Sequence, residues 1–259
     1  MSKLMNQTEF FASLEAARMP KHGGGHAFSR AWAAGELSRA QLGEWAIQHF
    51  YYIDPIPQQF AQLYARLPDL DARQHLLENL LGEEMPACPE KRHPDLLRKF
   101  ARACGVSDER ILRAEDNGEI LPTTRAMRAW IWELSSIRHL SESCAGIMVA
   151  LEGQLPTLYP KYVDAMRKMG FTEDDMEFFH VHIEGDTEHA HIGLELTARY
   201  ATTAEIQTRA IAAVRASAEM RYSMLDGIYA SVLARKAADR KSTRLNSSHA
   251  GLSRMPSSA

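Results

Sequence analysis

The sequence has few cysteines and no long apolar run, and each absence excludes a class of protein. Its 259 residues include three cysteines, Cys88, Cys104 and Cys144, and no Cys-x-x-Cys pair, which argues against a disulfide framework and a zinc ribbon. No run of 18 or more apolar residues occurs, so we expect no membrane-spanning helix. The first residues lack the charged and then apolar layout of a signal peptide. We therefore expect a cytoplasmic protein that binds no membrane.

An excess of positive charge is also lacking. The chain has 30 Lys and Arg against 33 Asp and Glu, a net charge of −3, so we expect no nucleic-acid partner. The glycines at 23–25 are not followed by the lysine and hydroxyl residue of a Walker phosphate loop, and no Gly-x-Ser-x-Gly elbow of a serine hydrolase occurs. Hydrophobic residues make up 45% of the chain, enough for a sizeable core.

The pattern that is present is helical. Apolar residues follow the helical period between Gln7 and Arg240, and no segment alternates as a strand does. We expect helices at about 8–18, 39–66, 71–84, 94–104, 107–114, 122–153, 156–169, 172–200 and 203–237. The predicted fold class is all-α: one domain over residues 1–240, a helical bundle of about seven to eight helices when the short ones at 8–18 and 107–114 are not both counted. Residues 241–259 have no period and few apolar side chains, and we expect a disordered tail, genuine or a sequencing artefact, without function.

A cluster of metal-binding side chains is predicted on the helix at 172–200. His182, Asp186 and His189 are spaced by four and three residues, which places them on one helix face. Two imidazoles and a carboxylate on one face can bind a transition metal. His180 and His191 are rotated from His182 by about 160° and about 180°, so we expect neither to be a ligand.

Further candidate ligands lie in two other segments. Glu152 follows six apolar residues, and it is either a helix-end residue in water or a buried carboxylate that needs a cation. Glu83, Glu84, Glu90 and His93 surround Pro86 and Pro89, and such a segment by itself is typical of a solvated connection. A set of Glu83, His93, Glu152, His182, Asp186 and His189 would carry a charge of about −3, which two Fe(II) ions nearly neutralise. Oxygen and imidazole ligands without thiolate favour a dinuclear non-haem site.

These residues resemble those of the haem-oxygenase-like diiron oxidases and oxygenases, which are related in fold to the pyrroloquinoline-quinone synthase and thiaminase-II-like proteins. The resemblance runs from about residue 26 to 237. It depends on Asn79-Leu-Leu-Gly-Glu-Glu, on His93-Pro-Asp-Leu, on Glu152, and on Phe178-Phe-x-x-His with Asp186 and His189. It implies that the six residues bind two Fe(II) ions per chain, that O2 is the co-substrate, and that an external electron donor could take part. We also expect a homodimer that acts on a small molecule.

The spacing of Glu83 and His93 carries a finer resemblance. They are ten positions apart, with Glu90 three before the histidine, as in the N-oxygenating members. This implies that Glu90 is a seventh, catalytic metal ligand and that the enzyme oxygenates the nitrogen of an amine or amino acid. A solvent-facing Glu90 is the alternative.

Three other functions remain open at this point. One is oxidative C–C or C–N cleavage of an amino or fatty acid by the same diiron site. Another is a metal-free helical module that binds a ligand or a partner. The third is aminobenzoate formation, whose family members consume a tyrosine of their own. At the two matching positions this chain has Ser29 and Leu151, which argues against that third activity.

Overall fold

The computed structural model describes the backbone of residues 3–252, with side chains described for residues 3–183 and 191–235. Every element within this range is helical and none is a strand, so the all-α prediction is confirmed. The α-helices are α1 (Gln7–Arg18), α2 (Ala27–Ala33), α3 (Arg39–Ile53), α4 (Ile56–Arg66), α5 (Leu70–Glu84), α6 (His93–Ala103), α7 (Asp108–Leu112), α8 (Pro122–Ser136), α9 (Leu140–Cys144), α10 (Leu155–Lys168), α11 (Glu177–Tyr200) and α12 (Ala204–Leu252). None of the helices in the described part combines the length and apolarity of a membrane span.

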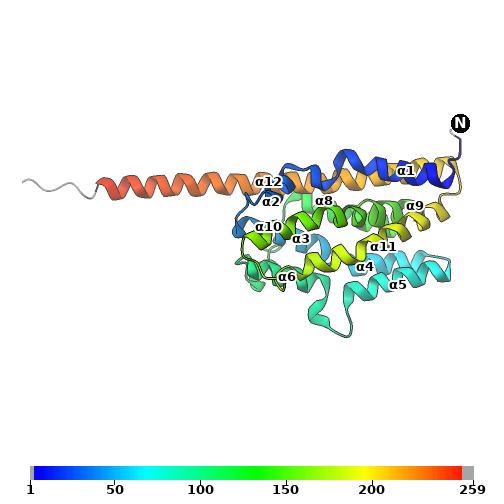
Figure 1. Cartoon of the computed structure of the whole chain (residues 1–259), viewed down its shortest axis with the longest axis horizontal. Coiled ribbons are helices and arrows are strands. Elements are labelled where there is room, and N and C mark those ends of the chain that lie inside the picture. The colour runs from blue at the N-terminus through cyan, green and yellow to red at the C-terminus, as the bar shows by residue number, and fades with distance from the viewer. Residues whose placement is uncertain (1–2, 253–259) are drawn as a thin grey trace, which may run out of the picture.

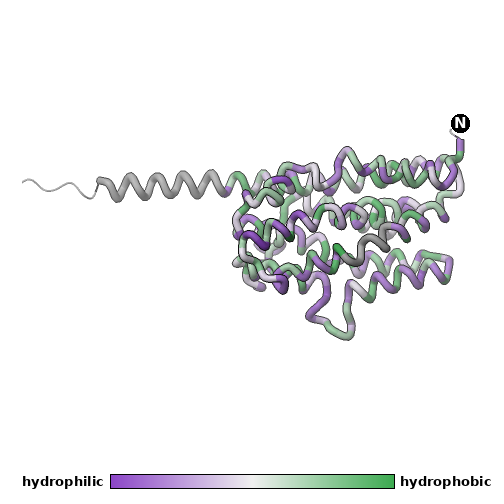
Figure 2. The backbone as a smooth tube through the Cα atoms, in the orientation of Figure 1, coloured by the Kyte–Doolittle hydropathy of each residue, from purple (hydrophilic) through white to green (hydrophobic). Residues whose placement is uncertain are grey.

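The long helices lie side by side as a bundle (Figure 1). Helix α12 packs along α1, α8 and α9, while α11 packs against α9 and α10. Along the bundle, apolar and polar residues alternate on each helix (Figure 2), as expected for helices with one face in a core. An aromatic cluster is at the centre, where the ring of Trp32 stacks on that of Tyr162 with centroids 4.1 Å apart. Trp45 and Phe179 are also buried there.

Several predicted long helices are divided, and the helices therefore outnumber the predicted seven to eight. The predicted helix at 39–66 is α3 and α4, because Pro55 has no N–H to continue the first helix. The predicted helix at 122–153 ends at Ser136, and His139 begins α9 with a capping box that includes Glu142. The prediction of single helices over these two ranges was wrong.

Two predicted helix ends also differ from the structure. Helix α11 begins at Glu177, because the hydroxyl of Thr172 caps a preceding turn by accepting from the backbone N–H of Asp175 at 3.1 Å. Helix α12 continues to Leu252, past the predicted end at 237, so the backbone at 241–252 is helical where a disordered tail was expected. This last part of α12 extends beyond the other helices (Figure 1).

The chain departs from α-helical geometry between α9 and α10. Residues Ala145–Val149 form a π-helix, η4, and Glu152–Gln154 form a short 3-10 helix, η5. Helix α11 approaches η4 closely at Gly193, where a Cβ atom would lie 2.6 Å from the Cβ of Met148. Because π-helical turns are frequent at functional sites, the turn that precedes Glu152 is a structural sign of one.

Candidate metal centre

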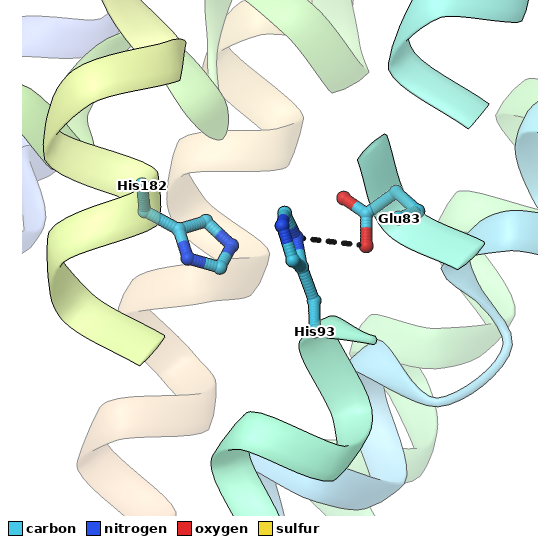
Figure 3. A group of neighbouring side chains, drawn as sticks. All are labelled: Glu83, His93 and His182. Carbon is cyan, nitrogen blue, oxygen red and sulfur yellow. Dashed lines mark ion pairs between the residues drawn. The ribbon is translucent and has the colours of Figure 1, made fainter. Parts of the chain in front are cut away.

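Glu83, His93 and His182 lie together, although they come from three helices. Glu83 is in the last turn of α5, His93 is the first residue of α6, and His182 is within α11. One ligand atom from each lies within 4.8 Å of the others. The Nδ1 atom of His93 is 3.0 Å from Oε2 of Glu83, and the ring centroids of His93 and His182 are 4.5 Å apart. The three side chains point toward one another (Figure 3).

The connection from α5 to α6 brings Glu83 and His93 together. Met85 ends α5 in the left-handed conformation with φ of 40°, which few residues other than glycine adopt, and Pro86 follows. Pro94 then lies in the first turn of α6, where its missing N–H is tolerated. The adjacent Glu84 instead accepts from Nε of Arg92 at 2.7 Å, so Glu83 is the glutamate that the structure places in the group.

A hydrogen bond sets the orientation of His182. Its Nδ1 atom lies 2.6 Å from the carbonyl oxygen of Phe178, which can only accept, so Nδ1 carries the proton. The lone pair is then on Nε2. Metal-binding histidines in proteins usually donate their second ring N–H in this way.

The chemistry of these donors fits iron. Two imidazoles and one carboxylate form the ligand set of many non-haem Fe(II) enzymes. No cysteine among the described residues belongs to the group, and burial raises the pKa of Cys104 and of Cys144 to about 12, which disfavours their thiolate forms. Cys144 is fully buried, which agrees with the prediction of a packing residue.

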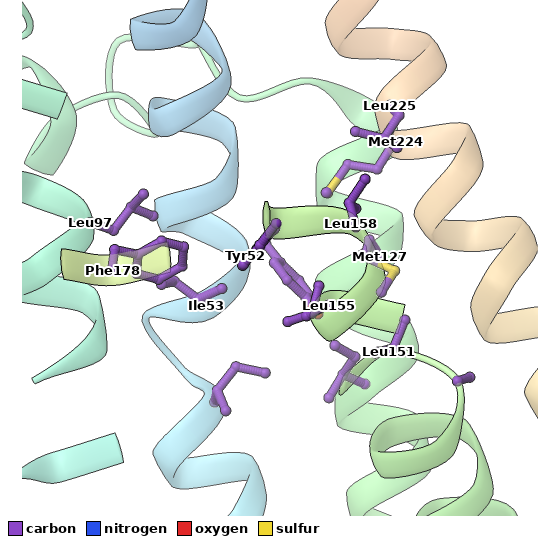
Figure 4. Close-up of a cluster of buried hydrophobic side chains, with 14 of the residues drawn as sticks. Tyr52, Ile53, Leu97, Met127, Leu151, Leu155, Leu158, Phe178, Met224 and Leu225 are labelled. Atoms are coloured by element: carbon purple, nitrogen blue, oxygen red, sulfur yellow. The ribbon is translucent and has the colours of Figure 1, made fainter. Parts of the chain in front are cut away.

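A cavity of about 80 Å³ adjoins the three side chains, and Glu152 lines it together with them. A buried water needs roughly 10–15 Å³ on a comparable measure, so the cavity has room for a few heavy atoms. Most of its wall is apolar, and Figure 4 shows Leu151 and Leu155 beside Tyr52 in the adjoining core. Its lining residues are His49, Tyr52, Ile53, Ile56, Phe60, Asn79, Gly82, Glu83, His93, Ile147, Leu151, Glu152, Leu155, Tyr159, Val181, His182 and Arg221.

The structure describes the side chains of only some of the other predicted ligands. Asp186 and His189 follow His182 on the backbone of α11, but their side chains lie outside the described residues. Glu90 is exposed in the 3-10 helix η3 (Pro89–Lys91) and lines a separate surface depression. His180 lines that depression as well and pairs with Glu173 at 2.9 Å.

His191 and His26 have partners away from the cavity. His191 pairs with Glu195 at 3.4 Å, in agreement with its predicted direction. His26 is buried, and its Nε2 atom is 2.9 Å from Oδ1 of Asp226. Its Nδ1 atom accepts from the N–H of Phe28 and so caps α2. His26 therefore has a structural role.

Several residues of the cavity, among them His49, Tyr159 and Arg221, were not predicted from the sequence. Arg221 is 3% exposed and lines the cavity from α12. It precedes Met224, Leu225 and Ile228 by three, four and seven residues, which places it on the apolar face of its helix. A charged residue on an apolar face was the signal that could have found it.

Comparison with known proteins supports an iron site, as the geometry does. The sequence pattern of a family described as iron-containing redox enzymes matches residues 43–222. The chain belongs to this family. It is 30% identical over 227 residues to a 4-aminobenzoate synthase of Nitrosomonas europaea, which covers 83% of this chain and 89% of that protein. It is 26% identical over 232 residues to a pyrroloquinoline-quinone synthase of Acidiphilium cryptum, covering 88% and 92%.

A solved structure supports the fold. A domain of unknown function with a haem-oxygenase-like fold from Shewanella denitrificans aligns with a TM-score of 0.72 at 15% identity, and the alignment covers 90% of this chain and 96% of that one. The predicted haem-oxygenase-like fold and the predicted family are both confirmed.

Proposed function

We propose that this protein is a non-haem dinuclear iron enzyme that uses O2 to oxygenate the nitrogen of a small amine or amino acid. The observation that carries the proposal is the approach of Glu83, His93 and His182 to within 4.8 Å beside a small cavity. Membership in a family of iron-containing redox enzymes supports iron as the metal and a redox reaction as the chemistry. The bound iron would supply the reduction of O2.

The remaining ligands in this proposal are Glu152, Asp186 and His189. Glu152 lines the same cavity as the three grouped residues. Asp186 and His189 follow His182 by four and seven residues on α11. A set of three carboxylates and three neutral imidazoles balances most of the charge of two Fe(II) ions. A single ion would leave the set with an excess negative charge.

The cavity favours an amine in its reactive form. A nitrogen can be oxygenated only when its lone pair is free, so the amine must lose its proton. Burial and a nearby positive charge both lower the pKa of an ammonium group. The apolar wall of this cavity provides the burial, and iron bound at the ligands would provide the positive charge.

Iron binding and product mass test the proposal. Protein reconstituted with Fe(II) without oxygen should hold close to two irons per chain in a colorimetric assay, and a value that stays below one contradicts a dinuclear site. After O2 is admitted with a panel of amines and amino acids, mass spectrometry should find one added oxygen on nitrogen. A lost carbon fragment would instead indicate oxidative cleavage of C–C or C–N bonds.

The relative from Nitrosomonas europaea favours a second candidate, the formation of 4-aminobenzoate. Two tyrosines, Tyr52 and Tyr159, line the cavity. Neither is at the positions of Ser29 and Leu151, where the resemblance places the consumed tyrosine. Ser29 instead accepts a hydrogen bond from the hydroxyl of Tyr162 at 2.7 Å. Release of 4-aminobenzoate with a matching loss of mass from the chain would favour this candidate.

A further inference from the structure

Arg221 is a buried positive charge in the wall of the cavity. Its side chain comes from α12 and is 3% exposed. The Nε atom has no hydrogen-bond partner among the described residues, and no carboxylate in that part of the chain forms an ion pair with it. Burying a charged group without a counter-ion is unfavourable by several kcal/mol as an order of magnitude. The arrangement therefore calls for an explanation.

The groups that interact most strongly with Arg221 are three phenols. Its guanidinium carbon is 5.6 Å from the ring centroid of Tyr52, and the hydroxyl groups of Tyr159 and Tyr162 are also close. Burial raises the pKa of Tyr52 and of Tyr159, and it raises that of Tyr162 to about 12, so all three phenols keep their protons at neutral pH. They give Arg221 polar contact without cancelling its charge.

Other shielded arginines of this chain have a different environment. Arg18 donates to the carbonyl oxygen of Val149 at 2.8 Å. Arg66 donates to the carbonyl oxygen of Ser135 at 2.7 Å, and Arg39 donates to two further carbonyl oxygens. These arginines connect helices through main-chain oxygens. Arg221 faces the cavity instead.

Two more residues that line the cavity have buried polar atoms that could donate a hydrogen bond to a bound anion. Nδ1 of His49 and Nδ2 of Asn79 are buried and have no partner among the described residues. The amide nitrogen is a donor, and the imidazole can donate as well. The described carboxylates that line the cavity, Glu83 and Glu152, are the metal ligands of the proposed function. If these two carboxylates bind metal, they cannot also serve as counter-ions, and Arg221 still lacks one.

We propose that Arg221 binds the carboxylate of the substrate, and that the substrate is a small amino acid or a related amino carboxylate. This inference rests on the proposed function for the place of the amine, which would lie toward the metal ligands. The volume of about 80 Å³ agrees with a substrate of that size. A guanidinium can also donate two parallel hydrogen bonds to a carboxylate, which fixes the orientation of the bound molecule.

A matched pair of probes tests the role of Arg221. 4-Methylpentanoate and 4-methylpentanamide have the same shape, but only the first has a charge, and neither has an amine that could be oxidised. Calorimetry should show that the carboxylate binds at least about tenfold more tightly than the amide. The titrations are done on metal-free protein and on protein loaded with Fe(II) without oxygen, since a carboxylate can also bind iron.

The variants then assign the preference to one residue. Arg221→Gln should bind the two probes with nearly equal affinity, whereas Arg221→Lys should keep part of the preference. Arg39→Gln, which removes an arginine outside the cavity, should behave as wild type. Circular dichroism checks the fold of each variant, and the Lys variant and the wild type still test the proposal if the Gln variant does not fold.

Two results would overturn the inference. One is equal affinity of the wild type for both probes in the metal-free protein. The other is a carboxylate preference that persists in a folded Arg221→Gln variant. Failure of the proposed function gives a different result, because the iron stoichiometry would then stay low while the preference of metal-free protein for the carboxylate remains.

Discussion

Replacing His182 by alanine removes one of the three grouped ligands and should weaken iron binding strongly. The imidazole of His182 lies 4.5 Å from that of His93 and is oriented by its hydrogen bond to the carbonyl oxygen of Phe178. Alanine can neither bind metal nor make this hydrogen bond. The two remaining ligands of the group, Glu83 and His93, come from the ends of two other helices.

The size of the effect follows from the place of His182 in the ligand set. Removing a hydrogen-bond partner of a metal ligand costs about 10- to 100-fold in metal affinity. Removing the ligand itself should cost at least about 100-fold, which is about 2.8 kcal/mol. The iron content should then fall from close to two per chain to one or less at the same free Fe(II) concentration.

The assay is an anaerobic Fe(II) titration with a colorimetric end point, and His180→Ala is its matched control. His180 is two residues away on the same helix, but it pairs with Glu173 and lines another depression. This control should bind iron as the wild type does, and both variants should be folded by circular dichroism. Equal losses in the two variants, or a wild-type titration for His182→Ala, would refute the assignment of the ligand face.

Three further predictions concern the rest of the molecule. Without Fe(II), α11 peptides that contain His182 should exchange amide hydrogens faster by mass spectrometry, because carboxylates at the cavity lose their counter-ions; equal protection in both states would contradict this. Mixing Fe(II)-loaded protein with O2 in a stopped-flow instrument should give a transient visible absorption band, and because Glu90 is exposed, Glu90→Ala should leave the lifetime of this band unchanged. A shorter lifetime in the variant would indicate the metal ligation that the resemblance implies. The hydrogen bond from Lys91 lowers the pKa of Glu177 below its ordinary value of 4.5, although burial acts in the opposite direction. The ionised carboxylate therefore stabilises the fold at pH values above 4.5, and this stabilisation is lost as the pH falls through the lowered pKa. Glu177→Gln should therefore lower the free energy of unfolding by up to about 1 kcal/mol at pH 7, and by progressively less as the pH falls below the ordinary pKa of 4.5, as measured by urea denaturation.

The sequence predicted the parts of the centre that depend on helical periodicity. The place of His182 on one face, and the opposite directions of His180 and His191, follow from 3.6 residues per turn. His93 and the two candidate glutamates beside each other were also found from sequence. The choice of Glu83 over Glu84 needed the structure, because it depends on the pairing of Glu84 with Arg92 across the turn.

Other features could not be read from periodicity. The division of the predicted helix at 122–153 depends on how His139 caps α9, and the π-helical turn Ala145–Val149 inserts an irregularity that composition does not mark. Arg221 was missed because a single charge on an apolar face does not change the period. Its burial depends on three tyrosines that come from α3 and α10.

The irregularities of the fold are concentrated at the ligands. Glu83 is followed closely by Met85 in a left-handed conformation, His93 begins a helix next to a proline, and Glu152 follows a π-helical turn. The left-handed conformation of Met85 costs of order 1–3 kcal/mol and persists where the surrounding structure requires it. Regular helices would direct these side chains elsewhere, whereas His182 reaches the same point from an ordinary helix. A bound metal would hold the three irregular segments against α11 by binding free energy, so loss of metal should loosen these segments before the aromatic core around Trp32.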